Sequence, residues 1–128
     1  PSSAAQSPSP RLLIARARSR GEGLWAAEEG LRSGALDAVV LEPDGPLDLT
    51  ASRRLQLAAE TGGALGLVLP GGAEAGALAP SALFSRWRAV PLPSDVSGPC
   101  TRRRIELALL RRRGGGAGRW VLEGEPAS

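Results

Sequence analysis

Short apolar runs alternate with helical patterns along the first half of the chain. Residues 33–42 (SGALDAVVLE) contain the apolar run 38–41, which does not alternate with polar residues and therefore predicts a strand buried on both faces of a sheet. We expect Val40 to be buried at its centre. Residues 11–17 and 64–69 predict two further buried strands, the first of them beside the central one.

Two amphipathic stretches predict helices between these strands. Residues 24–33 repeat apolar positions at helical spacing, and we expect Trp25 to pack this helix on the sheet. Residues 49–61 predict a second helix, which begins at a cap supplied by Asp48 or Thr50 and ends at Gly62 and Gly63. Right-handed crossovers in a β–α–β–α–β order give a parallel sheet.

The second half of the chain has the pattern of antiparallel strands. Residues 86–92 predict an edge strand because Pro91 and Pro93 lack the N–H that an inner strand needs. Residues 101–113 and 119–123 predict a β-hairpin around the Gly-rich turn 114–118. Its inner face is predicted to hold Ile105, Leu107, Leu109, Trp120 and Leu122, and its outer face Arg102, Arg104, Glu106 and Arg112.

The composition indicates one domain between two tails. Residues 1–10 are rich in Ser and Pro without apolar periodicity and predict a disordered tail; residues 11–125 form the predicted domain, and residues 126–128 a second tail. The chain contains no Met and begins with Pro1, so we expect it to be a processed or truncated chain. No apolar run reaches the roughly 20 residues that span a membrane.

Missing residue types exclude several kinds of catalysis. The chain has no His and no Lys, which excludes Ser–His–Asp and Cys–His nucleophiles, a Schiff base and the Lys of a phosphate-binding P-loop. The single Cys100 cannot form a disulfide within the chain, which predicts a reducing, cytoplasmic location, and it supplies too few ligands for zinc. We therefore expect a protein that is not an enzyme and binds no cofactor.

Positive charge is concentrated in the second half. All 16 basic residues are arginine, and residues 80–128 hold 9 of them against 4 acidic residues, whereas residues 1–79 hold 7 against 9. A basic segment of this kind favours acidic or phosphate-bearing partners.

Three separate blocks of the sequence resemble one protein family. The segment SGALDAVVLE resembles the helix end and strand that carry the second acidic nucleotide-site residue of RecA-type proteins, the Walker B position, with Glu42 at that position. More specifically, LWAAEEGLRSGALDAVV, LDLTASRRLQLAAETGG and RRRIELALLRRRGGGAGRWVLE together are similar to the ImuA-type, RecA-related accessory proteins of SOS mutagenesis. The resemblance implies an α/β fold: a RecA-like three-layer core with a largely parallel sheet flanked by helices and a C-terminal antiparallel hairpin.

The chain departs from the RecA pattern at the nucleotide site. It has no GxxxxGK[ST] segment, and a lone carboxylate at Glu42 would repel a triphosphate without a bridging metal. The resemblance therefore implies the fold and an accessory role without ATPase activity, with Glu42 vestigial. The alternative interpretation of Glu42, Asp44 and Asp48 is that they are only turn and cap residues.

The resemblance also implies partners for the basic half. These are an ImuB-type polymerase-like subunit, RecA or single-stranded DNA, in translesion DNA synthesis on the nucleoid of a bacterium. The candidate binding residues are Arg102, Arg104, Arg112, Arg53 and Arg54. Three alternatives stay open: the hairpin arginines are a solvated face, the protein is a SulA-like cell-division inhibitor that binds FtsZ, or it is an ATPase whose nucleotide loop lies in a missing upstream segment.

Overall fold

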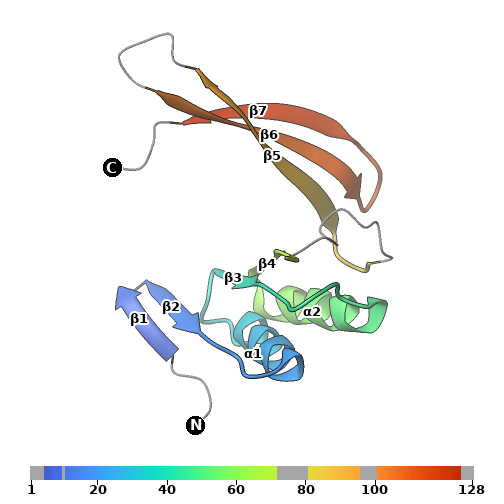
Figure 1. Cartoon of the computed structure of the whole chain (residues 1–128). Helices are drawn as coiled ribbons and strands as arrows, with labels where there is room; N and C mark the ends of the chain where they lie inside the picture. The colour runs from blue at the N-terminus through green and yellow to red at the C-terminus, as the bar shows by residue number, and fades with distance from the viewer. Residues whose placement is uncertain (1–4, 10, 72–80, 96–100, 125–128) are drawn as a thin grey trace. The chain divides into compact units, whose positions relative to one another are not determined.

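The computed structural model describes residues 5–9, 11–71, 81–95 and 101–124. Cys100, most of the predicted loop 70–80 and the predicted tail 126–128 lie outside these residues. The chain divides into two compact units, Pro1–Leu83 and Phe84–Ser128. Figure 1 shows the two helices in the first unit and three long strands in the second.

A parallel β–α–β unit organises the first half. Strand β3 (Ala38–Leu41) leads through helix α2 (Leu49–Gly62) to strand β4 (Leu65–Val68), and helix α1 (Arg20–Arg32) precedes it. The two strands pair in parallel from Ala38 opposite Leu65 to Leu41 opposite Val68. These elements confirm the predicted parallel pairing of the strands before and after α2.

Short side chains fix where both helices begin. Helix α1 starts one turn earlier than predicted because the Ser19 Oγ accepts a hydrogen bond from the Glu22 N–H at 3.2 Å. Helix α2 is capped at its start by Asp48, whose Oδ1 accepts from the Ala51 N–H at 2.7 Å, and at its end by Gly63 in the left-handed conformation, with φ of 66°. Both capping predictions for α2 are confirmed.

The core of this unit lies between the two helices and one face of the β3–β4 pair. The helices contact each other, α1 contacts β3, and α2 contacts β4. Four buried side chains form the centre of the core: Ala27, Leu31, Leu55 and Ala58. Val39, Leu41 and Val68 pack against this centre from the strands. Burial of this apolar surface is the main stabilising term for the unit.

A buried hydroxyl ties the end of this unit to α2. Ser52 is fully buried, and its Oγ donates to the Leu49 carbonyl at 2.9 Å and accepts from the Ala82 N–H at 3.0 Å. The hydroxyl is therefore satisfied as donor and as acceptor, as a buried polar group must be.

The prediction that β3 is buried on both faces is wrong. Its residues alternate between exposed and half-buried, and the Val40 side chain is 56% exposed. Leu65 and Leu67, on the same face of β4, are 59% and 45% exposed. Among the described residues, the helices cover only the face that carries Val39 and Leu41.

The predicted neighbour of the first strand is also wrong. Strand β2 (Leu12–Ala15) pairs antiparallel with β1 (Ala5–Ser9) in a separate sheet and not beside β3. Its apolar residues are about half exposed, and β1 lies within the stretch predicted as a disordered tail. Trp25, predicted to pack on the sheet, is 61% exposed. An apolar run marks a strand but does not specify which edge it pairs with.

The second unit is an antiparallel sheet in the order β5 (Ser85–Asp95), β6 (Arg102–Arg112) and β7 (Gly118–Gly124). The predicted edge strand and hairpin are both confirmed. The turn between β6 and β7 contains three consecutive glycines with positive φ, of 91°, 86° and 110°. Residues with a Cβ would be strained in such a turn.

Candidate functional site

The acidic residues Glu42, Asp44 and Asp48 follow β3 in a loop that is hydrogen-bonded to Arg20 of α1. Glu42 is exposed directly after the strand, and Asp48 caps α2. The Arg20 guanidinium donates from Nη1 to the Asp44 carbonyl at 3.3 Å and from Nη2 to the Pro46 carbonyl. In the described part of the chain, no group of three or more His, Cys, Asp or Glu residues could hold a metal ion. Asp48 therefore has the role of a cap residue, the alternative interpretation of this cluster.

Arg54 joins the two helices. Its Nη2 lies 2.8 Å from Glu28 Oε2, and Glu28 Oε1 lies 2.6 Å from Arg32 Nη2. Glu28 is only 9% exposed, and the two guanidinium groups compensate the charge of its buried carboxylate. Arg53 is exposed and forms no ion pair with another described residue. Of the two predicted binding residues on α2, only Arg53 is without an ionic partner inside the described structure.

One face of the C-terminal sheet carries charges of both signs, and we call it the charged face. Arg104 lies directly opposite Glu123, with 3.3 Å between Nε and Oε1, and Arg102 Nη1 lies 3.9 Å from Glu123 Oε2. Arg119 Nη1 lies 3.8 Å from Glu106 Oε1 on the same face. Two predicted site residues, Arg102 and Arg104, are thus brought together, with Glu123 between them.

Arg112 does not share the charged face, and this part of the prediction is wrong. The register runs from Trp87 opposite Leu109 to Arg86 opposite Arg111, which leaves Leu110 as an extra residue on β6. A β-bulge of this kind reverses the alternation of the residues beyond it. Arg112 therefore lies opposite Ser85, on the side that carries Trp87, and Arg111 takes the side of Arg86.

The opposite face, which we call the tryptophan face, is apolar at its centre. Trp87 and Trp120 have ring centroids 5.6 Å apart with planes inclined by 43°. A Cβ added at Gly118 would lie 2.5 Å from the Trp120 ring, so the indole lies directly over this glycine. Leu109 stands in the row between Trp87 and Gly118 and is 8% exposed, whereas both indoles are about half exposed, at 49% and 48%.

Most residues of the predicted inner face of the hairpin are not buried. Leu109 is buried, but Ile105, Trp120 and Leu122 are 41%, 48% and 52% exposed. The shared face itself is confirmed by the pairs Ile105 with Leu122 and Leu107 with Trp120. The period-2 pattern therefore predicted correctly which residues share a face, but it did not predict how exposed that face is.

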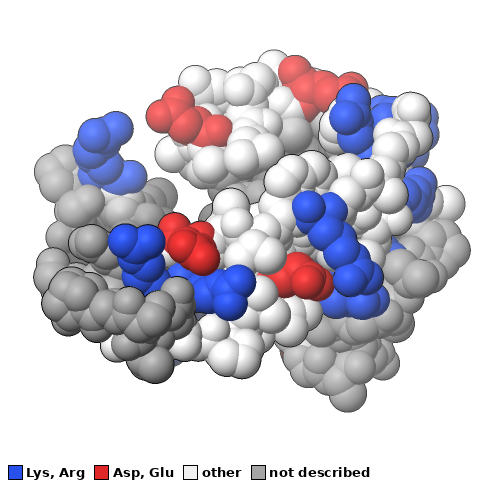
Figure 2. Space-filling model, turned by 90° about the horizontal axis from the view of Figure 1, so that it is seen from above, with Lys and Arg blue, Asp and Glu red and all other residues white. Residues whose placement is uncertain are grey.

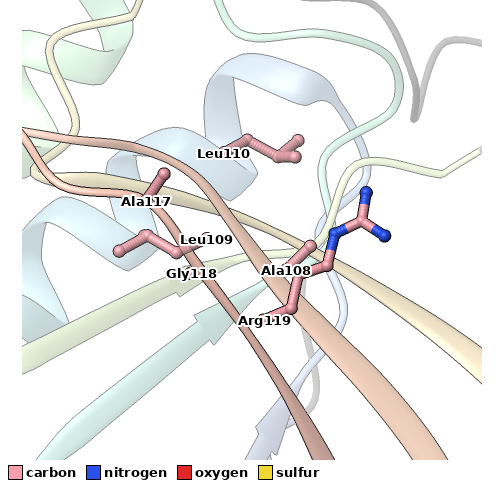
Figure 3. A pocket seen from close by; sticks show the side chains of 6 residues that line it. All are labelled: Ala108, Leu109, Leu110, Ala117, Gly118 and Arg119. Atoms are coloured by element: carbon pink, nitrogen blue, oxygen red, sulfur yellow. The ribbon is translucent and has the colours of Figure 1, made fainter.

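A shallow hollow of about 440 Å³ lies at the turn end of the hairpin (Figure 3). Its lining residues are Ala108, Leu109, Leu110, Ala117, Gly118 and Arg119. Arg119 is the one charged residue of this lining, beside Ala108 on the neighbouring strand. The lining therefore offers neither an acid–base pair nor a set of metal ligands.

Figure 2 shows arginine side chains in blue and acidic side chains in red among uncharged residues. None of the helices in the described ranges is long and apolar enough to cross a membrane. The fold and the site together define a mixed α/β protein whose C-terminal sheet presents a charged face and a tryptophan face.

Comparison with known proteins gives the family. The chain is similar to Protein ImuA of Caulobacter vibrioides strain NA1000 / CB15N and of strain ATCC 19089 / CIP 103742 / CB 15, with 42% identity over 132 aligned residues in each case. The alignment covers 94% of this chain and 53% of each relative. No protein-family model matches the chain, and no solved structure matches it significantly.

The chain is therefore an ImuA-type protein, as the three sequence blocks predicted. It spans about half the length of the curated relatives that it matches.

Proposed function

We propose that this chain is part of a non-catalytic accessory factor of the bacterial response to DNA damage, which acts in SOS-induced translesion synthesis by holding protein partners together. The observation that supports it is the 42% identity to ImuA along 94% of the chain. In this proposal the β3–α2–β4 unit is the later part of a RecA-like three-layer core.

The proposed role is binding and not nucleotide hydrolysis. The chain contains no GxxxxGK[ST] segment to hold a triphosphate. The Arg20 guanidinium also binds two carbonyls of the loop that follows Glu42. A nucleotide at this strand end would have to approach a loop that is already cross-linked to α1.

The charged face is the proposed surface for a protein partner, an ImuB-type subunit or RecA. Arg102 and Arg104 are 62% and 36% exposed at the side chain, so they can reach a partner while Glu123 holds them in place. Glu106 and Glu123 lie among the arginines of this face, so charges of both signs follow one another along it. Charges of alternating sign match a protein surface with the complementary pattern.

The test is to replace Arg102 and Arg104 together by Ala. We expect binding to purified ImuB or RecA of the same bacterium to weaken by about tenfold, because the carboxylates of the partner lose their counterparts. The melting temperature should change little because Arg102 is exposed and Arg104 is half-buried, and ion pairs near the surface contribute little to stability. Binding is measured by surface plasmon resonance and melting by circular dichroism.

The matched control is the double substitution of Arg103 and Arg112 by Ala. It removes the same charge, from +3 to +1, but from the opposite face. This control should retain partner binding. Equal weakening by both double variants would mean that net charge and not the charged face determines the interaction, and the assignment would then be wrong.

A further inference from the structure

The tryptophan face combines exposed aromatic rings with a distribution of charge unlike that of the charged face. The register places Arg103 at one end of this face and Arg112 at the other, with the indoles of Trp87 and Trp120 between them. Along β6 the two arginine positions are about 30 Å apart at the usual rise of a strand. Neither arginine forms an ion pair with a residue in the described ranges.

No described residue on the tryptophan face carries a carboxylate. The three acidic positions of the described sheet all belong to the charged face: Asp95 opposite Arg102, Glu106 opposite Val90, and Glu123 opposite Arg104. One side of the sheet is therefore mixed in charge, whereas the other side carries only positive charge around an aromatic centre.

We propose that the tryptophan face binds single-stranded nucleic acid. Bases would stack on the exposed faces of Trp87 and Trp120, and backbone phosphates would bind the guanidinium groups of Arg103 and Arg112. Stacking on aromatic side chains and a positively charged track for the backbone are the two elements of sequence-independent single-strand binding. This proposal goes beyond the accessory role, since it concerns another face and another class of ligand.

The local structure prepares the indoles for stacking. The Trp120 ring lies over Gly118, which has no side chain to lift it, and the Trp87 Nε1 donates to the Ser85 Oγ at 3.0 Å. Both rings are thus held on the sheet with about half of their surface open. Rings that are already oriented lose little conformational entropy when a base stacks on them.

A protein ligand fits this face less well. An apolar protein surface would gain nothing from the two terminal arginines and would have to leave them without partners or supply acidic residues at both ends. A single strand supplies flat apolar bases and anionic phosphates in regular alternation, so one ligand satisfies both features of the face.

Salt dependence of binding tests the phosphate contacts. Fluorescein-labelled oligothymidylate is titrated with the full chain at a series of salt concentrations, and anisotropy is recorded. We expect binding at low salt that weakens log-linearly as salt increases. Substitution of Arg103 and Arg112 by Ala should make the slope less steep by about 1.4, at about 0.7 per phosphate contact.

The control for this experiment is the double substitution of Arg88 and Arg111 by Ala. Both residues are exposed, and their register positions lie on the side of the charged face. This variant removes the same charge and should leave the slope unchanged. Equal slopes for the two double variants, or no binding of the oligothymidylate by the folded wild-type chain at low salt, would overturn the proposal.

Tryptophan fluorescence tests the stacking directly. In a Trp25→Phe background the remaining indoles are those of the sheet, and oligothymidylate should quench their emission. Trp120→Ala should weaken binding by about tenfold, within the range measured for loss of one stacked base. Because this variant also removes the ring that lies over Gly118, Trp120→Phe is the folded comparison, and it should bind with intermediate affinity. Unquenched emission at saturating oligothymidylate would contradict the proposal.

Discussion

Substitution of Val39 by Asp is expected to unfold the N-terminal unit. Val39 packs against the cluster formed by Ala27, Leu31, Leu55 and Ala58, and a Cβ built on Gly30 would be 3.3 Å from its Cγ2. The side chains of this cluster are all apolar. A carboxylate there loses its hydration without gaining a partner, at a cost of about 3 kcal/mol or more in the free energy of unfolding.

The neighbouring residue provides the control. Val40 is 56% exposed on the opposite face of β3, so Val40→Asp should retain a cooperative transition close to that of the wild type. Urea denaturation followed by circular dichroism measures both variants. If Val40→Asp unfolded the unit while Val39→Asp did not, the strand would face the helices with the other side, and the described core would be wrong.

Substitution of Gly62 by Ala is also expected to lower the stability of the N-terminal unit strongly. A Cβ at Gly62 would overlap the carbonyl oxygen of Leu31 and would lie 2.8 Å from the Leu31 carbonyl carbon. These atoms belong to the backbone of α1, which cannot move aside as a flexible side chain can. The helices must separate or the last turn of α2 must distort, and we expect a loss of about 3 kcal/mol in stability.

Gly21→Ala is the matched substitution for this test. Gly21 lies in α1, and a Cβ there would meet no atom within 4 Å. Because Ala favours a helix over Gly, this variant should be as stable as the wild type or up to about 1 kcal/mol more stable. Equal thermal stability of the Gly62→Ala and Gly21→Ala variants would show that α1 and α2 do not approach closely at Gly62.

The sequence predicted the positions of the helices and strands better than the burial of their faces. Periodicity, caps and glycine stops located both helices, the parallel crossover and the hairpin, because these depend on local chemistry. Burial depends on what lies across a face, and the same apolar run at Val40 is compatible with a covered or an open strand. The sequence therefore could not establish that one side of β3 is exposed.

The candidate site was predictable in part for the same reason. Alternation of residues correctly joined Arg102 with Arg104, but a bulge at Leu110 moved Arg112 to the other face, and no residue in that arginine-rich stretch marks a bulge. The ion pair of Arg54 with Glu28 was not predicted from the sequence. A signal for it was present, since Glu28 shares helical spacing with the buried Ala27 and Leu31 and so required a cationic partner.

The measurement that tests the proposed role most directly is the frequency of mutations induced by DNA damage. The chromosomal gene that encodes this chain is deleted, and cells are exposed to ultraviolet light beside the parent strain and a strain with the intact gene restored. Deletion is expected to lower the induced frequency to the spontaneous level, and the intact gene is expected to restore it. An induced frequency that is the same in the deletion and parent strains would contradict a role in damage-induced mutagenesis.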